Sequence, residues 1–241
     1  MHSPNGIKSI LFDLDGTLRH HLPEGGDLFT ERAVSLGVTV NEEDRLRAKR
    51  WEHYYFAQSP EIKMDSALFT DKDKFWIVFG KRRLVALGCP PEQAELLAPQ
   101  LSAFMRENYK PQVRVPPESR ALLSMLQGAG FILGVVSNRE TPFAEELTQM
   151  DLAQYFQFSL AAGEVHSHKP DPLIFMEALR RTGTSASETM YVGDNYFADV
   201  VGSRRAGLRP VLYDPNGLFP EAECDVIQSF DQLPNLLSNQ S

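Results

Sequence analysis

The feature that most constrains the fold is a regular alternation of apolar, strand-like runs with helical segments after Pro116-Pro117. The predicted elements are helix 118–130, strand 131–136, helix 142–150, strand 156–161, helix 171–182, strand 189–193, helix 197–206, strand 209–213, a short strand near 225–227 and a helix near 230–238. Strands that alternate with helices form a parallel sheet with helices on both faces. The sequence therefore predicts an α/β fold.

One further strand is predicted far upstream of this region. Residues 7–13 form an apolar run that ends on an acid and is followed by a turn. Because this strand could not bury both of its faces alone, we expect it to join the same sheet. The pattern between about 26 and 109 is mostly helical. We therefore predict a core made of residues 1–18 and 115–241, with a helical domain, 19–114, inserted into it.

Composition excludes several classes of protein. The 241 residues are 42% hydrophobic, which is enough for a folded core. The formal net charge of −8 argues against general nucleic-acid binding, which needs an excess of cationic side chains. No apolar run approaches the ~18 residues of a membrane span, and the polar start lacks the apolar segment of a secretory signal. Cys89 and Cys224 make neither a metal spacing nor a disulfide framework, so a cytoplasmic location is expected.

Polar side chains that can carry chemistry follow four of the predicted strands. They are Asp13, Asp15 and Thr17 after the first strand, Ser137 and Asn138 after the second, Lys169 in the loop beyond the third, and Asp194 and Asp199 after the fourth. In open α/β sheets, ligands bind beyond the carboxyl ends of the strands. We therefore expect these side chains to meet at one edge of the sheet.

The chemistry of this set points to a metal ion and a phosphate group. Carboxylates that crowd together repel one another and need a cation at neutral pH. Oxygen ligands without Cys or His indicate a hard ion, for which Mg²⁺ is the best match. Lys169 and Ser137 suit the remaining oxygens of a bound phosphate. Asp13 and Asp15 supply two acids, of which one can attack and the other can transfer protons.

Four motifs resemble, in order, those of the haloacid dehalogenase-like hydrolase superfamily, in its phosphatase branch. They are Asp13-Leu-Asp15-Gly-Thr17, Ser137-Asn138, Lys169-Pro170, and Gly193-Asp194-Asn195 followed by Asp199. The resemblance covers the predicted core. In position and helical character, the inserted domain is similar to the C1-type helical cap of subfamily IA. The resemblance implies a Rossmann-like parallel sheet core with an inserted helical cap domain.

The same resemblance implies roles for the acidic residues. Asp13 would be the nucleophile that forms an aspartyl-phosphate, and Asp15 would act as general acid and then as general base. The side chains of Asp13 and Asp194 and the backbone carbonyl of Asp15 would bind Mg²⁺. Asp199 would not bind the metal directly and would position a metal-bound water or Lys169.

The phosphate site is implied in the same way. Ser137 and the backbone N–H of Asn138 would hold the phosphate group. Lys169 would be both catalytic and substrate-binding, because its ammonium would neutralise Asp13 and the transferring phosphoryl group. Thr17 would contribute to the substrate site by orienting the turn through its hydroxyl. The implied activity is Mg²⁺-dependent hydrolysis of a phosphate monoester of a small metabolite.

Other activities stay open on the sequence. A dehalogenase of this superfamily would lack the second acid, Asp15, and would need no metal. A sugar-phosphate mutase uses the same core residues with cap groups that keep the phosphoryl group from water. A phosphonate hydrolase would need a Schiff-base lysine in the cap, where Lys49 and Lys63 are available. A binding module that keeps the core without turnover is the alternative outside catalysis, and the basic and aromatic segment 45–56 is the feature in its favour.

Each motif also has a purely structural interpretation. Asp13 and Asp15 could cap a turn, and an acid such as Asp194 is favoured at a helix N-terminus. His166 and His168 lie two residues apart but have no third soft ligand, so we interpret them as part of a polar loop. The four motifs together favour the catalytic interpretation, whereas the substrate and the oligomeric state are not visible in the sequence.

Overall fold

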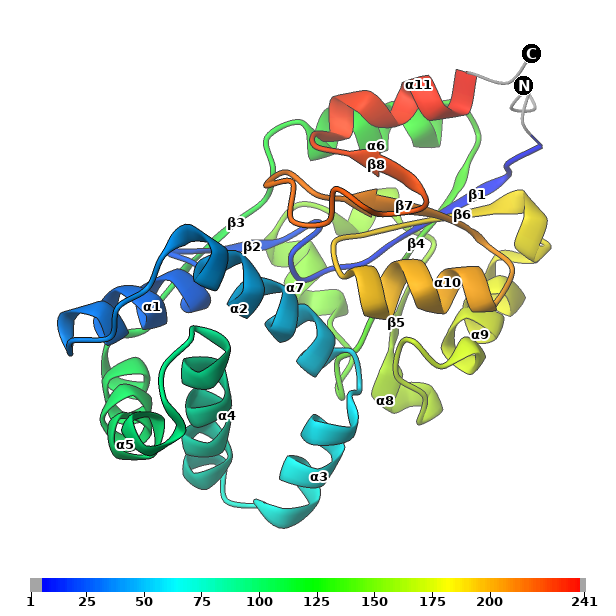
Figure 1. The fold of residues 1–241 in the computed structure, drawn as a ribbon. Helices are drawn as coiled ribbons and strands as arrows, with labels where there is room; N and C mark the ends of the chain where they lie inside the picture. The colour runs from blue at the N-terminus through cyan, green and yellow to red at the C-terminus, as the bar shows by residue number, and fades with distance from the viewer. Residues whose placement is uncertain (1–5, 239–241) are drawn as a thin grey trace. The chain divides into compact units, whose positions relative to one another are not determined.

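The structure, a computed structural model, describes residues 6–238, and the chain divides into two compact units. The core unit comprises Met1–His20 and Val115–Ser241, and the inserted unit comprises His21–Arg114. Figure 1 shows a sheet flanked by helices in the core unit and a group of helices in the inserted unit. Among the described helices, none has both the length and the apolar character that crossing a bilayer requires.

The core unit contains a six-stranded parallel sheet in the order β5-β4-β1-β6-β7-β8. Its strands are β1 (Ser9–Phe12), β4 (Ile132–Ser137), β5 (Phe158–Ala161), β6 (Thr189–Gly193), β7 (Arg209–Tyr213) and β8 (Asp225–Ile227). β1 lies between β4 and β6, and its Leu11 pairs with Gly134 on one side and Tyr191 on the other. The upstream strand therefore lies in the middle of the sheet. The predicted α/β fold with a parallel, Rossmann-like sheet is confirmed.

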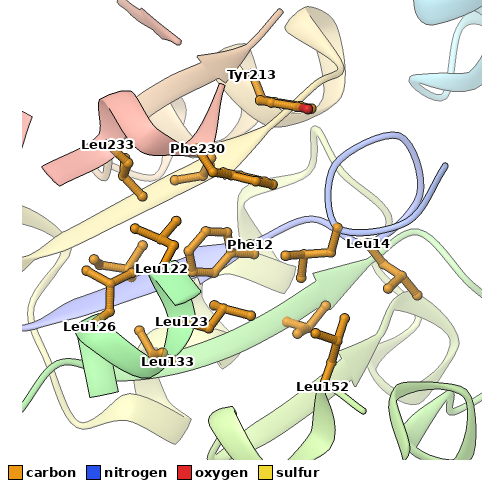
Figure 2. Close-up of a cluster of buried hydrophobic side chains, with 14 of the residues drawn as sticks. Phe12, Leu14, Leu122, Leu123, Leu126, Leu133, Leu152, Tyr213, Phe230 and Leu233 are labelled. Atoms are coloured by element: carbon orange, nitrogen blue, oxygen red, sulfur yellow. The ribbon is translucent and has the colours of Figure 1, made fainter. Parts of the chain in front are cut away.

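Side chains of β1 alternate between the two faces of the sheet, and each face has its own apolar cluster. Phe12 packs among the leucines of α6 (Ser119–Gly128) and lies edge-on to Phe230, with 6.3 Å between the ring centroids (Figure 2). Leu11 belongs to the other cluster, together with Phe175 of α9 (Pro172–Thr182). All four side chains are fully buried, and each such burial contributes about 1.5–3 kcal/mol. Apolar burial on both faces therefore holds β1, and with it the residues that follow, in a fixed place.

Six helices of the core unit precede or follow its strands along the described chain. They are α6 (Ser119–Gly128), α7 (Ala144–Gln149), α8 (Ala162–Val165), α9 (Pro172–Thr182), α10 (Val201–Arg205) and α11 (Leu233–Ser238). Short 3-10 turns occur at Ala153–Tyr155, Ala186–Glu188 and Phe230–Gln232. The sequence pattern did not predict α8, because four residues are too few to show a helical period.

The predicted helix 197–206 differs from the observed structure. A π-helical turn, Tyr196–Val200, comes first, and α10 follows it directly. The side chain of Asn195 begins this turn by accepting hydrogen bonds from the backbone N–H groups two and three residues further on, each at 3.0 Å. The backbone N–H of Asn195 in turn donates to Oδ2 of Asp199 at 2.9 Å. Wide π turns are frequent at functional sites, and this one fixes the carboxylate of Asp199.

The inserted unit is helical. Its helices are α1 (Gly25–Ser35), α2 (Glu42–Phe56), α3 (Pro60–Leu68), α4 (Lys72–Ala86) and α5 (Pro91–Asn108). α2 begins with a capping box, in which Asn41 and Asp44 each accept the other's backbone N–H at 2.9 and 3.0 Å. Buried apolar side chains from α1, α2, α4 and α5, including Phe29, Leu84 and Ala98, form its core. This unit therefore has an apolar core of its own.

Several basic side chains of the inserted unit have acidic partners within that unit. Arg83 is fully buried and pairs with Glu52, and one of its donors also reaches the carbonyl of Gly26 at 2.7 Å. Lys49 lies 3.2 Å from Glu24 and 3.1 Å from Asp27. These ion pairs use part of the basic segment 45–56 to hold α1, α2 and α4 together.

Two short strands were not predicted. β2 (His20–Leu22) and β3 (Gln112–Arg114) form a two-stranded sheet at the points where the chain enters and leaves the inserted unit. Three residues cannot show the period of two that marks a strand, so pairing between distant segments decides their conformation.

Candidate active site

The site begins with Asp13, one residue beyond β1 at the carboxyl edge of the sheet. Its backbone N–H donates to the carbonyl of Val192 in β6 at 2.9 Å, so the pairing of β1 with β6 continues to this residue. β4 ends at Ser137, and β6 ends directly before Asp194. Because the strands are parallel and in register, their ends bring Asp13, Ser137 and Asp194 to the same edge.

Lys169 lies at the centre of the site. Its ammonium donates to Oδ1 of Asp13 at 2.6 Å and to Oδ1 of Asp199 at 2.7 Å. It also contacts the hydroxyl of Tyr191 at 2.9 Å and the carbonyl of Val136 at 3.2 Å. All four side chains are buried. The lysine therefore links residues from three strand ends in a region with little access to water.

Burial changes the protonation of these groups. Loss of water around Asp13 raises its pKa well above the ordinary value of 3.8, and the charge of Lys169 opposes this rise. Burial and the neighbouring charge of Asp199 also raise the pKa of Asp194, to about 7. For Lys169, burial favours the neutral form, but Asp13 and Asp199 outweigh it and raise the pKa well above 10.5. The site thus favours a cationic lysine and disfavours crowded negative charge.

The donor set fits a divalent metal ion. One carboxylate oxygen from each of Asp13, Asp194 and Asp199 lies within 4.8 Å of the others. When all three are ionised, the single ammonium of Lys169 leaves two negative charges, which a hard divalent cation such as Mg²⁺ would balance. Asp199 differs from the other two, because one of its oxygens accepts from Lys169 and the other from the backbone of Asn195. Asp13 and Asp194 are therefore the better side-chain ligands.

The turn after β1 is tied to Asp194. The hydroxyl of Thr17 donates to Oδ1 of Asp194 at 2.9 Å and accepts from its backbone N–H at 3.0 Å. Gly16 lies beside the same carboxylate with φ +91°, and a Cβ at this position would lie 2.3 Å from Oδ2 of Asp194. Only glycine fits both the left-handed backbone and this close approach. Thr17 and Gly16 therefore orient Asp194.

Asn138 holds the loop that carries Lys169. Its Oδ1 accepts from the backbone N–H of Lys169 at 2.6 Å, and its Nδ2 donates to the carbonyl of the same residue at 2.9 Å. Ser137 is buried as the last residue of β4. The side chain of Asn138 is thus engaged by the backbone of Lys169. Its backbone N–H, rather than its side chain, is therefore the candidate donor to a phosphate.

Asp15 belongs to a separate network. Its carboxylate accepts hydrogen bonds from Arg19 and Arg139, and both arginines also pair with Glu146 of α7. Although burial raises the pKa of Asp15, the hydrogen bond from Arg139 and the charges of Arg19 and Arg139 lower it below 3.8 overall. The side chain of Asp15 is therefore held as a carboxylate, apart from the cluster around Lys169.

Sequence reasoning missed several members of these networks. Arg139 directly follows Ser137-Asn138, and Arg19 comes four residues after Asp15, so proximity to the motifs was an available signal for both. Glu146 carried no such signal. Tyr191 looked like an ordinary core residue of β6, yet its hydroxyl donates to the carbonyl of Val136 at 3.0 Å beside Lys169.

The loop histidines do not lie in the carboxylate cluster. His168 contacts Oε1 of Glu140 through Nε2 at 2.7 Å. His166 follows α8 with φ 50° and ends that helix in a left-handed conformation. Within residues 6–238, the only group of three or more possible metal ligands is the aspartate cluster, which contains neither histidine.

Comparisons with known proteins indicate the family of this chain. A family model described as haloacid dehalogenase-like hydrolase matches residues 78–212, more than half of the chain. The phosphoserine phosphatase of Thermus thermophilus is 31% identical over 236 residues, which cover 89% of this chain and 91% of the relative. The ribulose-1,5-bisphosphate 5-phosphatase of Halopiger xanaduensis is 28% identical over 228 residues, which cover 93% of this chain and 90% of the relative.

A solved structure has a similar fold. The crystal structure of a 2-haloacid dehalogenase from Pseudomonas syringae aligns with a TM-score of 0.56 and 29% identity, over 96% of this chain and 98% of that chain. This likeness extends over the sheet and the inserted helices alike. The motifs, the matched family and the phosphatase relatives agree, and we conclude that the chain belongs to the haloacid dehalogenase-like hydrolase family, in its phosphatase branch.

Proposed function

We propose that the protein is a Mg²⁺-dependent phosphomonoester hydrolase that acts on a small phosphorylated metabolite through an aspartyl-phosphate. The observation that carries this proposal is the ammonium of Lys169 between the buried Asp13 and Asp199, with the half-buried Asp194 in the same cluster. Phosphoryl transfer depends on placement and on charge neutralisation more than on other covalent chemistry. A buried lysine and oriented carboxylates supply both.

In the first step, a carboxylate oxygen of Asp13 attacks the phosphorus atom. The new Asp13–phosphorus bond forms as the bond to the ester oxygen breaks, and that oxygen leaves with a proton from Asp15. Asp15 must first take up this proton from solvent, against the charges of Arg19 and Arg139 that favour its carboxylate form. In the second step, Asp15 takes a proton from water, and the water oxygen attacks phosphorus. Inorganic phosphate leaves and Asp13 regains its carboxylate. Lys169 neutralises Asp13 and the phosphoryl oxygens in both steps.

A metal ion would be held by the side chains of Asp13 and Asp194 and by the backbone carbonyl of Asp15. The ion would supply charge stabilisation for the phosphoryl oxygens. Asp199 would position Lys169, in agreement with its 2.7 Å contact to the ammonium. The contacts of Thr17 with Asp194 support a role in orienting that ligand.

The phosphate would be bound by the hydroxyl of Ser137, the backbone N–H of Asn138 and the ammonium of Lys169. Thr17 would contribute by orienting the turn through its hydroxyl, which contacts Asp194. This placement is supported by the pairing of β1 with β4, because it brings Ser137 at the end of β4 beside Asp13, which directly follows β1. Two relatives are named for phosphoserine and for ribulose-1,5-bisphosphate, both small phosphorylated metabolites, and we extend this class to the present chain. The free thiols of Cys89 and Cys224 are compatible with the cytoplasmic location we propose.

The test is release of inorganic phosphate from a panel of phosphate monoesters that includes p-nitrophenyl phosphate. Wild type and Asp13→Asn are compared in Mg²⁺ and in EDTA. We expect release that requires the metal and that the nearly isosteric variant loses, while its circular dichroism spectrum stays unchanged. Wild-type rates for Asp13→Asn on every ester would show that Asp13 is not the nucleophile. No release by wild type would reject the proposal and favour phosphoryl isomerisation, which the same panel reveals by product analysis.

A further inference from the structure

Asp15 is held by a closed ring of charged side chains that the proposed chemistry does not require. Arg19 donates from Nε to Oδ1 of Asp15 at 2.9 Å and from Nη2 at 2.5 Å. Arg139 donates from Nε to Oδ2 at 2.8 Å. Each arginine also pairs with one oxygen of Glu146, Arg139 at 2.5 Å and Arg19 more closely. We name these three residues, Arg19, Arg139 and Glu146, the Asp15 clamp.

The clamp joins segments from three parts of the core unit. Arg19 comes from the turn after β1, where its backbone N–H and carbonyl bond Leu14 and Gly16 at 2.9 and 2.7 Å. Arg139 directly follows the Ser137-Asn138 motif, and Glu146 lies on α7. The guanidinium of Arg139 also lies 5.9 Å from the ring of buried Phe143. Arg19 is therefore also held through its backbone, and Arg139 also contacts an aromatic ring.

The clamp contacts a side chain that is partly exposed. The side chain of Asp15 is 39% exposed, whereas that of Arg19 is only 9% exposed. Planar guanidinium groups hold a carboxylate in a defined orientation through several donors at once. Two cations face two anions in the ring, so its charges balance. Glu146 pairs with both arginines and thereby braces them against Asp15.

We propose that Arg19, Arg139 and Glu146 are positioning residues that hold the Asp15 carboxylate as the base for hydrolysis of the aspartyl-phosphate. This inference rests on the proposed function. In this step a water proton passes to a carboxylate oxygen of Asp15, the water oxygen bonds to phosphorus, and the Asp13–phosphorus bond breaks. The carboxylate must point at one water molecule, and oriented bonds from two arginines supply that alignment.

The test separates formation of the phosphoenzyme from its hydrolysis. With p-nitrophenyl phosphate, kcat/KM reports the steps up to loss of nitrophenolate, which needs little help from an acid. For Arg139→Gln we expect kcat and KM to fall together by at least tenfold, with kcat/KM changed less than threefold. A burst of nitrophenolate and acid-stable accumulation of phosphorylated protein after quenching should accompany this change. Arg139→Lys keeps the positive charge but lacks the planar guanidinium with its several N–H donors. Its kcat should therefore lie between those of Arg139→Gln and wild type.

Glu146→Gln and Arg180→Gln complete the design. Glu146→Gln weakens the support of both arginines without removing a contact of Asp15. It should therefore show the same kinetic pattern with a smaller fall in kcat. If Arg139→Gln does not fold, this variant provides the test. Arg180 also pairs with a glutamate in the core unit, at 2.8 Å, but is 73% exposed on α9, and its variant should match wild type.

The proposed role of the clamp would be wrong if kcat and kcat/KM fell equally in Arg139→Gln and Glu146→Gln. It would also be wrong if neither constant changed in these variants. Wild type that releases no phosphate and forms no phosphoenzyme would instead reject the proposed function itself. The two failures are therefore distinguishable in one set of measurements.

Discussion

The ammonium of Lys169 lies 2.6 Å from Oδ1 of Asp13, and both side chains are less than a tenth exposed. A second carboxylate, Asp199, accepts from the same ammonium at 2.7 Å. Taking these charges out of water is unfavourable unless each one has a partner. The lysine therefore has a structural role in holding the acidic cluster together, in addition to the catalytic role proposed for it.

Replacing Lys169 with methionine removes this charge with little change in length. We expect Lys169→Met to lose turnover and to lower the free energy of unfolding by about 3–5 kcal/mol, since buried carboxylates lose their partner. Urea denaturation at pH 7 measures the change. The control is Lys8→Met, because Lys8 pairs with Glu188 but is 50% exposed; it should cost about 1 kcal/mol or less. Equal stabilities of Lys169→Met and wild type would contradict a structural role.

Mg²⁺ should stabilise the folded protein through Asp194. Binding to the native state alone adds about 2.7 kcal/mol at a metal concentration one hundred times Kd, so the thermal midpoint should rise as Mg²⁺ is added. Asp194→Asn should shift this rise to higher concentrations, because a ligand charge is lost. Differential scanning fluorimetry with and without EDTA measures the effect independently of activity. A variant that responds to Mg²⁺ as wild type does would exclude Asp194 as a ligand.

Gly16→Ala tests the close approach of the turn to Asp194. The added Cβ would lie 2.3 Å from Oδ2, at a backbone φ of +91°. The matched control is Gly37→Ala, because Gly37 has φ +92° and no atom within 4 Å of an added Cβ. The control should lose about 1–2 kcal/mol for the backbone conformation alone. We expect a larger loss for Gly16→Ala in chemical denaturation, together with weaker Mg²⁺ stabilisation, which the control should not show.

Acid should weaken an ion-pair group on α9. The side chains of Arg180 and Arg181 hydrogen-bond to Glu177 and lower its pKa from 4.5 to about 2. Because the folded pKa is the lower one, the stabilisation is complete above pH 4.5 and is lost as the pH falls towards 2. Glu177→Gln should lower the free energy of unfolding by about 0.3–1 kcal/mol at pH 6. This difference should shrink below pH 3, and a difference independent of pH would contradict the assignment.

Much of the fold could be predicted, because its signals are local. Strand 189–193 and strand 209–213 match β6 and β7 residue for residue, since continuous apolar runs mark buried parallel strands. β2 and β3 could not be predicted, because three-residue strands depend on pairing across almost the whole length of the inserted unit. The π turn before α10 also escaped prediction, since its hydrogen bonds depend on the side chain of Asn195 rather than on a period.

The sequence by itself determined the α/β class and the residues at the strand ends, because the alternation of apolar strands with helices is a local pattern. The parallel sheet that this pattern implies has the carboxyl ends of its strands at one edge, where Asp13, Ser137 and Asp194 lie. Only the tertiary structure decided how these residues are partnered. The contact between Arg139 and Asp15 spans 124 positions, and that between Arg19 and Glu146 spans 127. No local pattern encodes such pairs, since they depend on which loops the strand order and helix packing place side by side.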